Sequence, residues 1–382
     1  MSFYMAACFA ANAIIGFMPL WFADRGLTPT QIGQVLGFAG LLRVFAGPAW
    51  GIVADRLGRR RPVLLGAGCA AASMALLYVA STGFLPILLV AAGQGLCASA
   101  INPLADSLAL SLAREERMEY GPVRAVGSAS FMVATAVAGW LLTAVGSWLV
   151  PWMLALGYGS AAAVTPFLPE ARTPPAPPRL GGAFALFGNR AFLLAVAGTA
   201  LIQGSHAAYY GFAALLWRSQ GISDQVIGLL IAEGIIVEIL LFARGRALIA
   251  WLGPPGLTAC AALASIVRWS ITAFSPSLAI LFVVQILHAG TFAMQHQSSM
   301  LILSRAVPPE RAATAQALHS ALGYGAPAGI TMLVTGWLYT RYGGLAFLAM
   351  AALGGAGLLL VAPTAAALRR LPALASRPTS GS

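Results

Sequence analysis

The chain has 382 residues, of which 59% are hydrophobic and only 9% are charged, and its mean hydropathy is +0.83. This composition excludes a water-soluble globular domain, because the surface of such a domain needs many more polar side chains. The formal net charge of +11 involves arginine and no lysine, since all 22 basic residues are arginines.

Apolar runs of about 20 residues recur along the chain, and each can cross a hydrocarbon core of roughly 30 Å. The alternating segments of about ten residues that are typical of a membrane β-barrel do not occur in the sequence. We therefore predict an all-α polytopic membrane protein. Its twelve transmembrane helices are expected near 3–22, 29–53, 62–80, 85–112, 122–146, 148–168, 191–217, 224–243, 256–274, 277–304, 311–338 and 343–363.

The arginines between the predicted helices indicate the orientation of the chain. With the N-terminus inside, 17 arginines fall in cytoplasmic segments and three in outside loops, while Arg43 and Arg268 lie within helices. Cytoplasmic loops of membrane proteins carry such an excess of basic residues. We expect a multi-pass protein of the bacterial inner membrane with both termini in the cytoplasm. The charge then reflects topology and contact with lipid, and we expect no nucleic-acid partner.

Neither the cysteines nor the histidines form a pattern that indicates a metal or a cofactor. Each cysteine falls in a different predicted helix, where we expect it to pack as a small apolar side chain: Cys8, Cys69, Cys97 and Cys260. The four histidines are not spaced with acids as in a metal or hydrolase motif, which disfavours an intramembrane enzyme. We expect no cleavable signal peptide, since the first apolar run lacks a basic segment before it and continues as a full span.

The sequence divides into two halves at a proline-rich stretch, LPEARTPPAPPRLGG, which favours an extended linker. We expect a first six-helix bundle over 1–168 and a cytoplasmic linker over 169–190. A second six-helix bundle is expected over 191–363, followed by a cytoplasmic tail over 364–382.

The halves also repeat each other. GLTPTQIG at 26–33 opens the second predicted helix, and GISDQVIG at 221–228 opens the eighth, 195 residues later. Many transporters are built from such repeats, with the binding site between them near the middle of the membrane.

The same offset relates two charged residues inside predicted helices, Arg43 and Glu238. A charge at that depth costs about 2.5–3.5 kcal/mol on insertion scales. Two such residues at matched positions predict a water-accessible cavity between the halves, lined by both side chains. The alternative is that each charge is neutralised within its own half.

Two further charged residues lie inside predicted helices. Asp106, in INPLADSLAL of helix four, could bind a proton or a cation, or it could pair with Arg124 or Arg43. Arg268 of helix nine is expected to pair with Glu238 or with a bound anion.

Polar and aromatic residues also recur at helical spacing on helices seven and ten. At about 100° per residue, one stripe of helix seven contains Gln203, His206 and Tyr210. One face of helix ten contains Gln285, His288, Phe292, Gln295 and Ser299. His296 points about 80° away from that face. We expect both faces to line the cavity, the alternative being isolated hydrogen bonds between helices.

The segment GIVADRLGRRR, residues 51–61, resembles the signature loop of the major facilitator superfamily. In that family the loop stabilises one of two alternating states, so the resemblance implies a conformational switch, to which we also assign Arg124. The switch residues of the loop are Gly51, Asp55, Arg56, Gly58, Arg59 and Arg60. Gly51 permits close helix contact, Asp55 can neutralise a helix N-terminus of the other half, and the arginines can meet carboxylates or lipid phosphates. The alternative is a basic stop-transfer cluster alone.

Four further segments look like the 3-phenylpropionic acid transporter family within that superfamily: EYGPVRAVGSASF, QGSHAAYYGF, VRWSI and VVQILHAGTF. The resemblance implies twelve helices in two pseudo-symmetric six-helix bundles and import of an aromatic carboxylate with protons. The family is similar to lactose-type oligosaccharide:proton symporters, whose acid, Arg and His are matched here by Glu238, Arg268 and His288. Those symporters carry a further acid where this chain has Thr291, so Glu238, Asp106 and His288 all stay open as the proton carrier.

We predict a proton-coupled symporter that imports a small organic anion, such as a phenylpropionate, by alternating access. The proton gradient supplies the energy, and no cofactor is needed. Arg43 or Arg268 would bind the carboxylate, since a guanidinium stays charged and binds it bidentately. A proton-coupled sugar or nucleoside symporter and a drug:proton antiporter are the alternatives. We expect the protein to act as a monomer.

Overall fold

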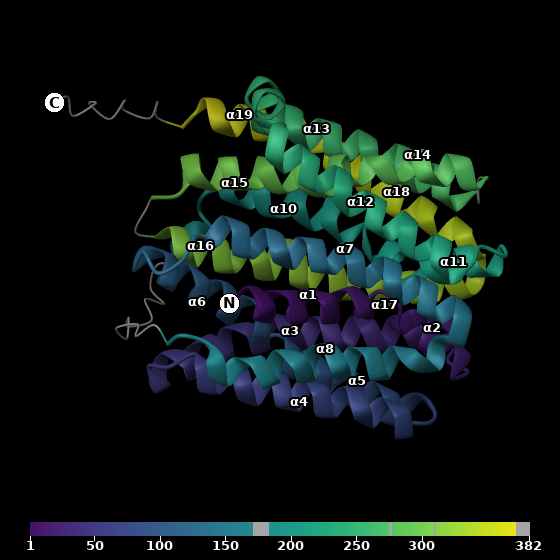
Figure 1. Ribbon diagram of the computed structural model, residues 1–382. Helices are drawn as coiled ribbons and strands as arrows, with labels where there is room; N and C mark the ends of the chain where they lie inside the picture. The colour runs from purple at the N-terminus through teal and green to yellow at the C-terminus, as the bar shows by residue number, and fades with distance from the viewer. Residues whose placement is uncertain (171–182, 275–276, 309–310, 372–382) are drawn as a thin grey trace.

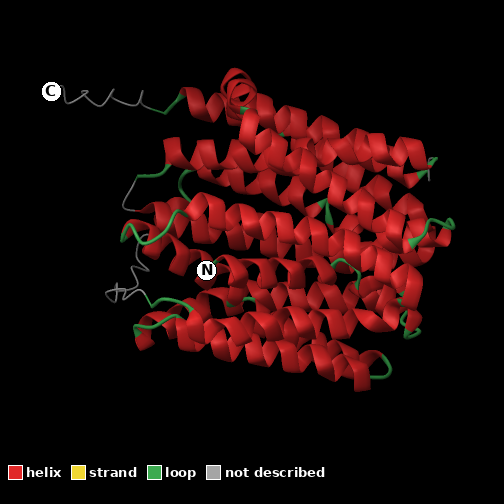
Figure 2. Cartoon of the chain, in the orientation of Figure 1, coloured by secondary structure: helices red, strands yellow, loops and turns green. Residues whose placement is uncertain are grey.

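The computed structural model describes residues 1–170, 183–274, 277–308 and 311–371. Helices fill this part of the chain, and it contains no strand (Figure 2). The long helices run side by side, with their loops at two opposite ends (Figure 1). We call the end with the turns at 25–28 and 220–223 the outer end, and the end with the loop at 58–60 the arginine-rich end.

The first half of the chain forms six membrane-spanning units. α1 and α2 are bent by 42° at a short break and make one unit, and α5 and α6 also make one. The helices are α1 (Ser2–Ile15), α2 (Met18–Asp24), α3 (Pro29–Leu57), α4 (Arg61–Ala80), α5 (Phe84–Ala98), α6 (Ile101–Arg114), α7 (Tyr120–Val145) and α8 (Val150–Val164).

The second half contains the same number of units, but three of them include a π-helical segment. Its α-helices are α9 (Ala183–Leu186), α10 (Arg190–Gly204), α11 (Ala214–Ser219), α12 (Asp224–Arg244), α13 (Arg246–Ala273), α14 (Leu278–His288), α15 (Gln295–Ala306), α16 (Ala312–His319), α17 (Ala326–Tyr342), α18 (Ala346–Leu359) and α19 (Val361–Arg369). The π-helical segments are η4 (Tyr209–Ala213), η5 (Ala289–Met294) and η7 (Ser320–Gly325). A 3-10 turn, η8 (Gly343–Leu345), separates α17 from α18.

Twelve crossings follow from the lengths of these units. Ten helical runs of the described chain are long and apolar enough to cross a membrane, and the bent pair α1–α2 is an eleventh. The last run, Thr314–Arg369, has 56 residues. At 1.5 Å per residue this is about 80 Å of helix, more than twice the thickness of a hydrocarbon core. The turn at η8 divides it into two spans, in agreement with the predicted twelve.

The ninth span differs from its prediction at one end. α13 begins ten residues earlier than the predicted range, but Gly253 interrupts it with non-helical backbone angles (φ 58°, ψ 177°). The two residues that follow are prolines, which lack the backbone N–H that a continuous helix needs. The apolar span therefore starts near Pro254, and the residues before the break form an extra helical segment at the arginine-rich end.

The two copies of the sequence repeat have the same local structure. Gly26 and Gly221 both adopt left-handed backbone angles, with φ of 81° and 82°, which residues with a side chain rarely adopt. Thr28 and Ser223 occupy the N-cap positions of α3 and α12. Thr28 also forms a capping box, in which it and Gln31 each accept a backbone N–H of the other.

Each copy of the repeat also makes a close crossing with the other half. At Gly33, α3 crosses α17 so closely that a Cβ atom would lie 2.7 Å from the Gly336 Cα. At Gly228, α12 crosses α7, and a Cβ atom would lie 2.7 Å from the Thr135 carbonyl oxygen. A larger residue at either position would push the helices apart, because Cβ atoms do not approach other atoms this closely.

The hydrogen bonds between the halves all lie at the outer end. They join Arg218 to Asp24 (3.1 Å), the Gln225 N–H to Thr143 (2.8 Å) and Thr30 to Thr340 (2.8 Å). Over the described ranges, no hydrogen bond or ion pair connects the halves at the arginine-rich end. The structure is therefore latched at the outer end only.

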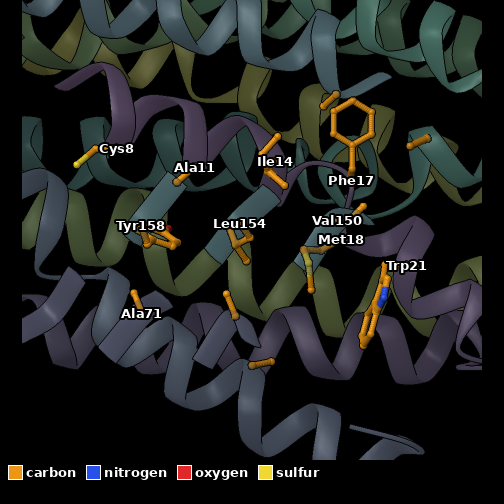
Figure 3. Packing of buried hydrophobic residues seen from close by; sticks show 14 of the residues in the cluster. Cys8, Ala11, Ile14, Phe17, Met18, Trp21, Ala71, Val150, Leu154 and Tyr158 are labelled. Atoms are coloured by element: carbon orange, nitrogen blue, oxygen red, sulfur yellow. The ribbon is translucent and has the colours of Figure 1, made fainter. Parts of the chain in front are cut away.

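Small residues let the helices of the first half pack closely. Figure 3 shows Cys8, Ala11 and Ile14 of α1 beside Leu154 and Tyr158 of α8. Cys8 is fully buried there, as predicted. The packing prediction is wrong for Cys69, which is exposed, because it lies on a side of α4 that no other helix covers.

Parts of the predicted linker and tail lie outside the described residues, namely 171–182 and 372–382. Of the remaining linker residues, Ala183–Leu186 form α9, and Leu186 packs in a buried apolar cluster. The helical structure of the last span continues as α19 to Arg369, and Ala367 joins the same cluster.

Candidate functional site

Two cavities lie between the halves. The first, of about 420 Å³, is lined by Arg43 together with aromatic and apolar residues of both halves, and we call it the Arg43 cavity. The second, of about 260 Å³, is lined by residues that include Arg124, Glu238 and His288, and we call it the Glu238 cavity. The two cavities share four wall residues, Phe131, Tyr209, Tyr210 and Ile231.

Arg43 lies ten residues after Gly33 on α3, about 15 Å farther toward the arginine-rich end. Its side chain is exposed and contributes to the wall of the Arg43 cavity. It makes no hydrogen bond or ion pair with any residue that the structure describes. Arg43 therefore presents a free guanidinium group between the halves.

Glu238 lies ten residues after Gly228 on α12, at the position that matches Arg43 in the repeat. Its side chain is 20% exposed, and its Oε2 atom lies 3.5 Å from Nε2 of His288. Both residues belong to the second half and line the Glu238 cavity. Glu238 thus faces the space between the halves while it contacts a partner of its own half.

Arg268 is fully buried and lies behind this site. Its Nη1 atom is 2.9 Å from Nδ1 of His288 and 3.1 Å from Oγ1 of Thr291, and its Nη2 atom is 2.8 Å from Oε1 of Gln285. Within the described part of the chain, no carboxylate lies within 4.0 Å of this guanidinium. The predicted contact between Arg268 and Glu238 does not form, because the imidazole of His288 stands between them.

Aromatic rings complete the surroundings of Arg268. Its guanidinium carbon lies 4.5 Å from the ring centroids of both Tyr209 and Trp269. Such contacts stabilise a cation that has lost its water. Trp269 is held in place by a hydrogen bond of 2.8 Å from its indole N–H to Ser205. Tyr209 has a second role, since it separates Arg268 from the Arg43 cavity.

The predicted stripe of helix seven divides between the interior and the cavity. Gln203 is buried and donates to the carbonyl oxygen of Phe292 at 3.2 Å. His206 is buried and lies 3.0 Å from Thr291 Oγ1. Tyr210 is 48% exposed and lines both cavities. The π-helical segment η4 begins at Tyr209, between the buried part of the stripe and its exposed end.

The predicted face of helix ten is divided in the same way. His288 and Phe292 line the Glu238 cavity. Gln295 is turned into the second half, where it donates to Thr199 at 3.3 Å and to Ser299 at 3.2 Å. The segment η5 includes Phe292 and ends directly before Gln295, and a π-helical segment contains an extra residue that rotates all later side chains.

The same rotation changes the environment of His296, which the regular helical pattern turned away from the polar face. Its Nδ1 atom lies 2.9 Å from the hydroxyl of Tyr324, on the π-helical segment η7. Its ring also meets Phe242, one turn after Glu238 on α12, with centroids 6.2 Å apart. The sequence contained no signal for this contact.

In the first half, Asp106 and Arg124 form the pair that the sequence left as an alternative. Arg124 Nε lies 3.9 Å from Asp106 Oδ1, and the hydroxyl of Tyr120 donates to the same oxygen at 3.3 Å. Arg124 also stacks over the ring of Phe9 and lines the Glu238 cavity. It lies in the first turns of α7, at the arginine-rich end of the helix that the sequence predicted over 122–146.

The signature loop is held by its own half. Glu170 accepts hydrogen bonds from the backbone N–H groups of Arg60 and Arg61, at 3.0 and 3.4 Å, and lies 3.9 Å from Nε of Arg59. Asp55 is exposed, and its carboxylate makes no hydrogen bond or ion pair with another residue in the described ranges. The predicted contact of Asp55 with the other half is absent from this conformation, in which the arginine-rich end is unlatched.

A polar cluster at the outer end had no counterpart among the predicted site residues. Arg218 binds Asp224 with its Nε and Nη2 atoms, at 2.9 and 2.5 Å, and reaches Asp24 of the first half with Nη1. Ser147 donates a hydrogen bond to the same oxygen of Asp24. The only signal in the sequence was an arginine among the few charges of the outside loops.

Comparison with known proteins agrees with this architecture. The MFS_1 like family model matches residues 2–349. The chain is 30% identical over 355 residues to the "Probable 3-phenylpropionic acid transporter" of Escherichia coli (strain K12), which covers 91% of this chain and 92% of that protein. It is 28% identical over 347 residues to the maltose permease of Geobacillus stearothermophilus, with 89% and 87% covered.

Solved structures share the fold at lower identity. The nucleoside transporter NupG superposes with a TM-score of 0.77 at 18% identity, covering 97% of this chain and all of that chain. A bacterial homologue of the human lysosomal transporter Spinster, in an inward-facing and unoccupied conformation, superposes with a TM-score of 0.70 at 16% identity, covering 96% and 94%. Together with the family-model match, which takes in most of the chain, these similarities show that the chain belongs to the MFS_1-like family of major facilitator superfamily transporters.

Proposed function

We propose that this transporter is a proton-coupled symporter that imports a small organic anion, with an aromatic carboxylate such as 3-phenylpropionate as the leading candidate. The observation that carries the proposal is the free guanidinium of Arg43 in a cavity between the halves. A cation in a cavity between the halves, with no anion beside it, is suited to bind one, because a charge-assisted hydrogen bond is roughly twice as strong as a neutral one. The similarity to the 3-phenylpropionic acid transporter supports the same substrate class.

The walls of the Arg43 cavity suit an aromatic acid. Phe131, Tyr209 and Tyr210 offer ring faces and edges, while the remaining lining is mostly aliphatic. Its volume of about 420 Å³ lies in the range of roughly 300–1,000 Å³ that is typical of small-molecule sites. We infer that the carboxylate binds Arg43 and that the ring packs against these aromatic side chains. Arg268 is less suited to bind substrate, since Tyr209 and Trp269 cover it and its Nη atoms already have partners.

The proton is assigned to Glu238. Import of an anion against an inside-negative potential costs about 2.3 kcal/mol per 100 mV, and a proton that travels with it removes that cost. Glu238 lines a cavity that shares walls with the Arg43 cavity, so a proton and an anion could occupy neighbouring positions. Asp106 is a weaker candidate, because Arg124 and Tyr120 already bind its carboxylate.

The conformation supports alternating access in the bacterial inner membrane. With the arginine-rich end in the cytoplasm, latching at the outer end alone corresponds to an inward-facing state. In the outward-facing state, Asp55 of the signature loop would engage the other half. The substrate and proton sites are both formed within one chain, so a monomer is sufficient.

A proton-coupled sugar symporter is the second candidate. The similarity to maltose permease and the arrangement of Glu238, His288 and Arg268 favour it. Competition decides between the two: aromatic acids, but not sugars or nucleosides, should inhibit counterflow of labelled 3-phenylpropionate in proteoliposomes. The direction of flux driven by an acid exterior tests a drug:proton antiporter, which would move its substrate the opposite way.

A further inference from the structure

We propose that Arg268 fixes the tautomer of His288, so that His288 is a constant hydrogen-bond donor to Glu238 and does not itself carry the transported proton. The inference rests on the proposed function and assigns a positioning role within the same site. It separates two of the three residues that the sequence left open as the proton carrier.

The assignment follows from the donor chemistry of arginine. A guanidinium has only N–H groups and cannot accept a hydrogen bond. Nδ1 of His288, at 2.9 Å from Nη1 of Arg268, must therefore be the unprotonated nitrogen. In a neutral imidazole the proton then lies on Nε2, which faces Oε2 of Glu238 at 3.5 Å. His288 consequently points its only N–H toward the carboxylate.

A second histidine lies in the same hydrogen-bonded cluster. Nδ1 of His206 lies 3.1 Å from the carbonyl oxygen of Ile202, which can only accept, so this nitrogen carries the proton. Its Nε2 atom is then an acceptor, 3.0 Å from the hydroxyl of Thr291, whose single hydrogen it shares with the carbonyl oxygen of His288 at 3.2 Å. The same hydroxyl oxygen accepts from Nη1 of Arg268 at 3.1 Å. Ile202 therefore sets the tautomer of His206, and Arg268 sets that of His288.

Protonation of His288 would break its hydrogen bond with Arg268. A proton on its Nδ1 atom would face the N–H of Arg268, in a buried place where a lost hydrogen bond cannot be replaced by water. Four charged or titratable groups face His288. They are Glu238 of α12, Arg268 of α13, His206 between α10 and η4, and Tyr209 of η4. Of these, only the carboxylate can take up a proton without opposing Arg268.

Glu238, in contrast, can change its protonation state without losing its contact with His288. Besides His288, the charged or titratable groups that line its cavity are Arg124 of α7 and Tyr209 and Tyr210 of η4, and His296 of α15 and Tyr324 of η7 lie near it. Across the 3.5 Å between Oε2 and Nε2, the charged carboxylate would accept from Nε2–H of His288. In its protonated form the carbonyl oxygen can still accept the same hydrogen bond. His288 therefore holds Glu238 in place in both protonation states.

Two amide substitutions distinguish a positioning role from a proton-carrying role. The amide nitrogen of His288→Gln can reach the position of Nε2 and keep the donor toward Glu238. The shorter amide of His288→Asn lies near Nδ1, where its oxygen can accept from Arg268, but its nitrogen does not reach the position of Nε2 and the donor toward Glu238 is lost. In proteoliposomes with an imposed pH gradient, we expect H288Q to reduce accumulation of 3-phenylpropionate about threefold and H288N at least tenfold, as the loss of one buried hydrogen bond allows.

Counterflow without a gradient is the control for folding and for the proposed function. If the wild-type protein shows no counterflow of any aromatic acid, the proposed function fails, whatever the histidine does. If H288Q keeps counterflow but loses accumulation entirely, His288 carries the proton and the inference is overturned.

A spectroscopic measurement tests the tautomer without any variant. In protein labelled with 15N-histidine, His288 should give the neutral Nε2–H pattern from pH 5 to pH 8, assigned by its absence from H288Q. A doubly protonated imidazolium signal for His288 within that range would contradict the proposal.

Discussion

The two arginines inside the membrane, one in each half, are in opposite situations. Arg43 lines a cavity and has no hydrogen-bond partner in the described chain, whereas Arg268 is fully buried and bonded to Gln285, Thr291 and His288. A free guanidinium can recruit an anion from solution. A bonded one organises the groups around it. The difference supports the proposal that the first half supplies the cation for substrate and the second half holds the proton site.

The largest effect is expected from removal of the free cation. Arg43→Gln should weaken binding of 3-phenylpropionate about 10- to 100-fold, since a hydrogen bond to a charged group is worth roughly 1.5–3 kcal/mol. Binding is measured by scintillation proximity in detergent. Arg43→Lys is the matched control. It keeps the charge but loses the bidentate geometry, so its affinity for 3-phenylpropionate should lie between those of the wild type and R43Q. Wild-type affinity in R43Q would show that another arginine binds the carboxylate.

The next effect concerns accumulation alone. Glu238→Gln cannot carry a proton, so a gradient of one pH unit, which supports about tenfold accumulation per proton, should drive none. Counterflow should persist, because exchange needs no net proton movement. The paired experiment with Asp106→Asn should leave accumulation in place. Accumulation by E238Q against a gradient would remove Glu238 from the coupling mechanism.

A smaller effect should follow from weakening the outer latch. Arg218 connects Asp224 of its own half to Asp24 of the other half, in a partly exposed setting where an ion pair contributes up to about 1 kcal/mol. Arg218→Gln should shift the population toward an outward-open state about fivefold. Labelling of a single cysteine placed at Arg43 by a membrane-impermeant reagent from outside measures the shift.

The control for this experiment is Arg341→Gln at the same end. Within the described part of the chain, Arg341 makes no hydrogen bond or ion pair to the other half, and its guanidinium carbon lies 5.8 Å from the ring centroid of Trp337 in its own half. Equal labelling in both variants would show that the latch does not hold the closed outer end.

The smallest effect in this conformation is expected at the signature loop. Asp55→Asn removes a carboxylate that has no partner here, so the stability of the inward-facing state in detergent should change by less than about 0.5 kcal/mol. Glu170→Gln, which removes the negative charge that faces Arg59 and Arg61 and weakens the hydrogen bond from the backbone N–H of Arg60, should lower stability more. A larger loss in D55N than in E170Q, in a thermal-shift assay, would contradict the description of the loop.

Much of the fold was predictable from the sequence, because the membrane imposes it. The helices follow from the length of apolar runs, and the repeat of GLTPTQIG and GISDQVIG gave the pseudo-symmetry that Gly26 and Gly221 bear out with nearly equal φ angles. The same offset led to Arg43 and Glu238, and both side chains line cavities between the halves.

The parts that were not predictable depend on small shifts in backbone register. Three π-helical segments in the second half each rotate the residues that follow them. The prediction assumed regular helical spacing, so it placed Gln295 on the cavity face and His296 away from it. In the structure Gln295 is turned into the second half, and His296 contacts Tyr324. Side-chain periodicity carries no signal for one extra residue in a turn. Nor did the sequence show that His288 would lie between Arg268 and Glu238, since that depends on the packing of three helices.

The measurement that tests the central claim most directly records both fluxes at once. Proteoliposomes with the wild-type protein, loaded with a pH-sensitive dye, are given labelled 3-phenylpropionate outside. The account predicts that anion uptake and acidification of the lumen rise together, and that Arg43→Gln abolishes both. Uptake of the anion without acidification, or undiminished paired fluxes in R43Q, would contradict it.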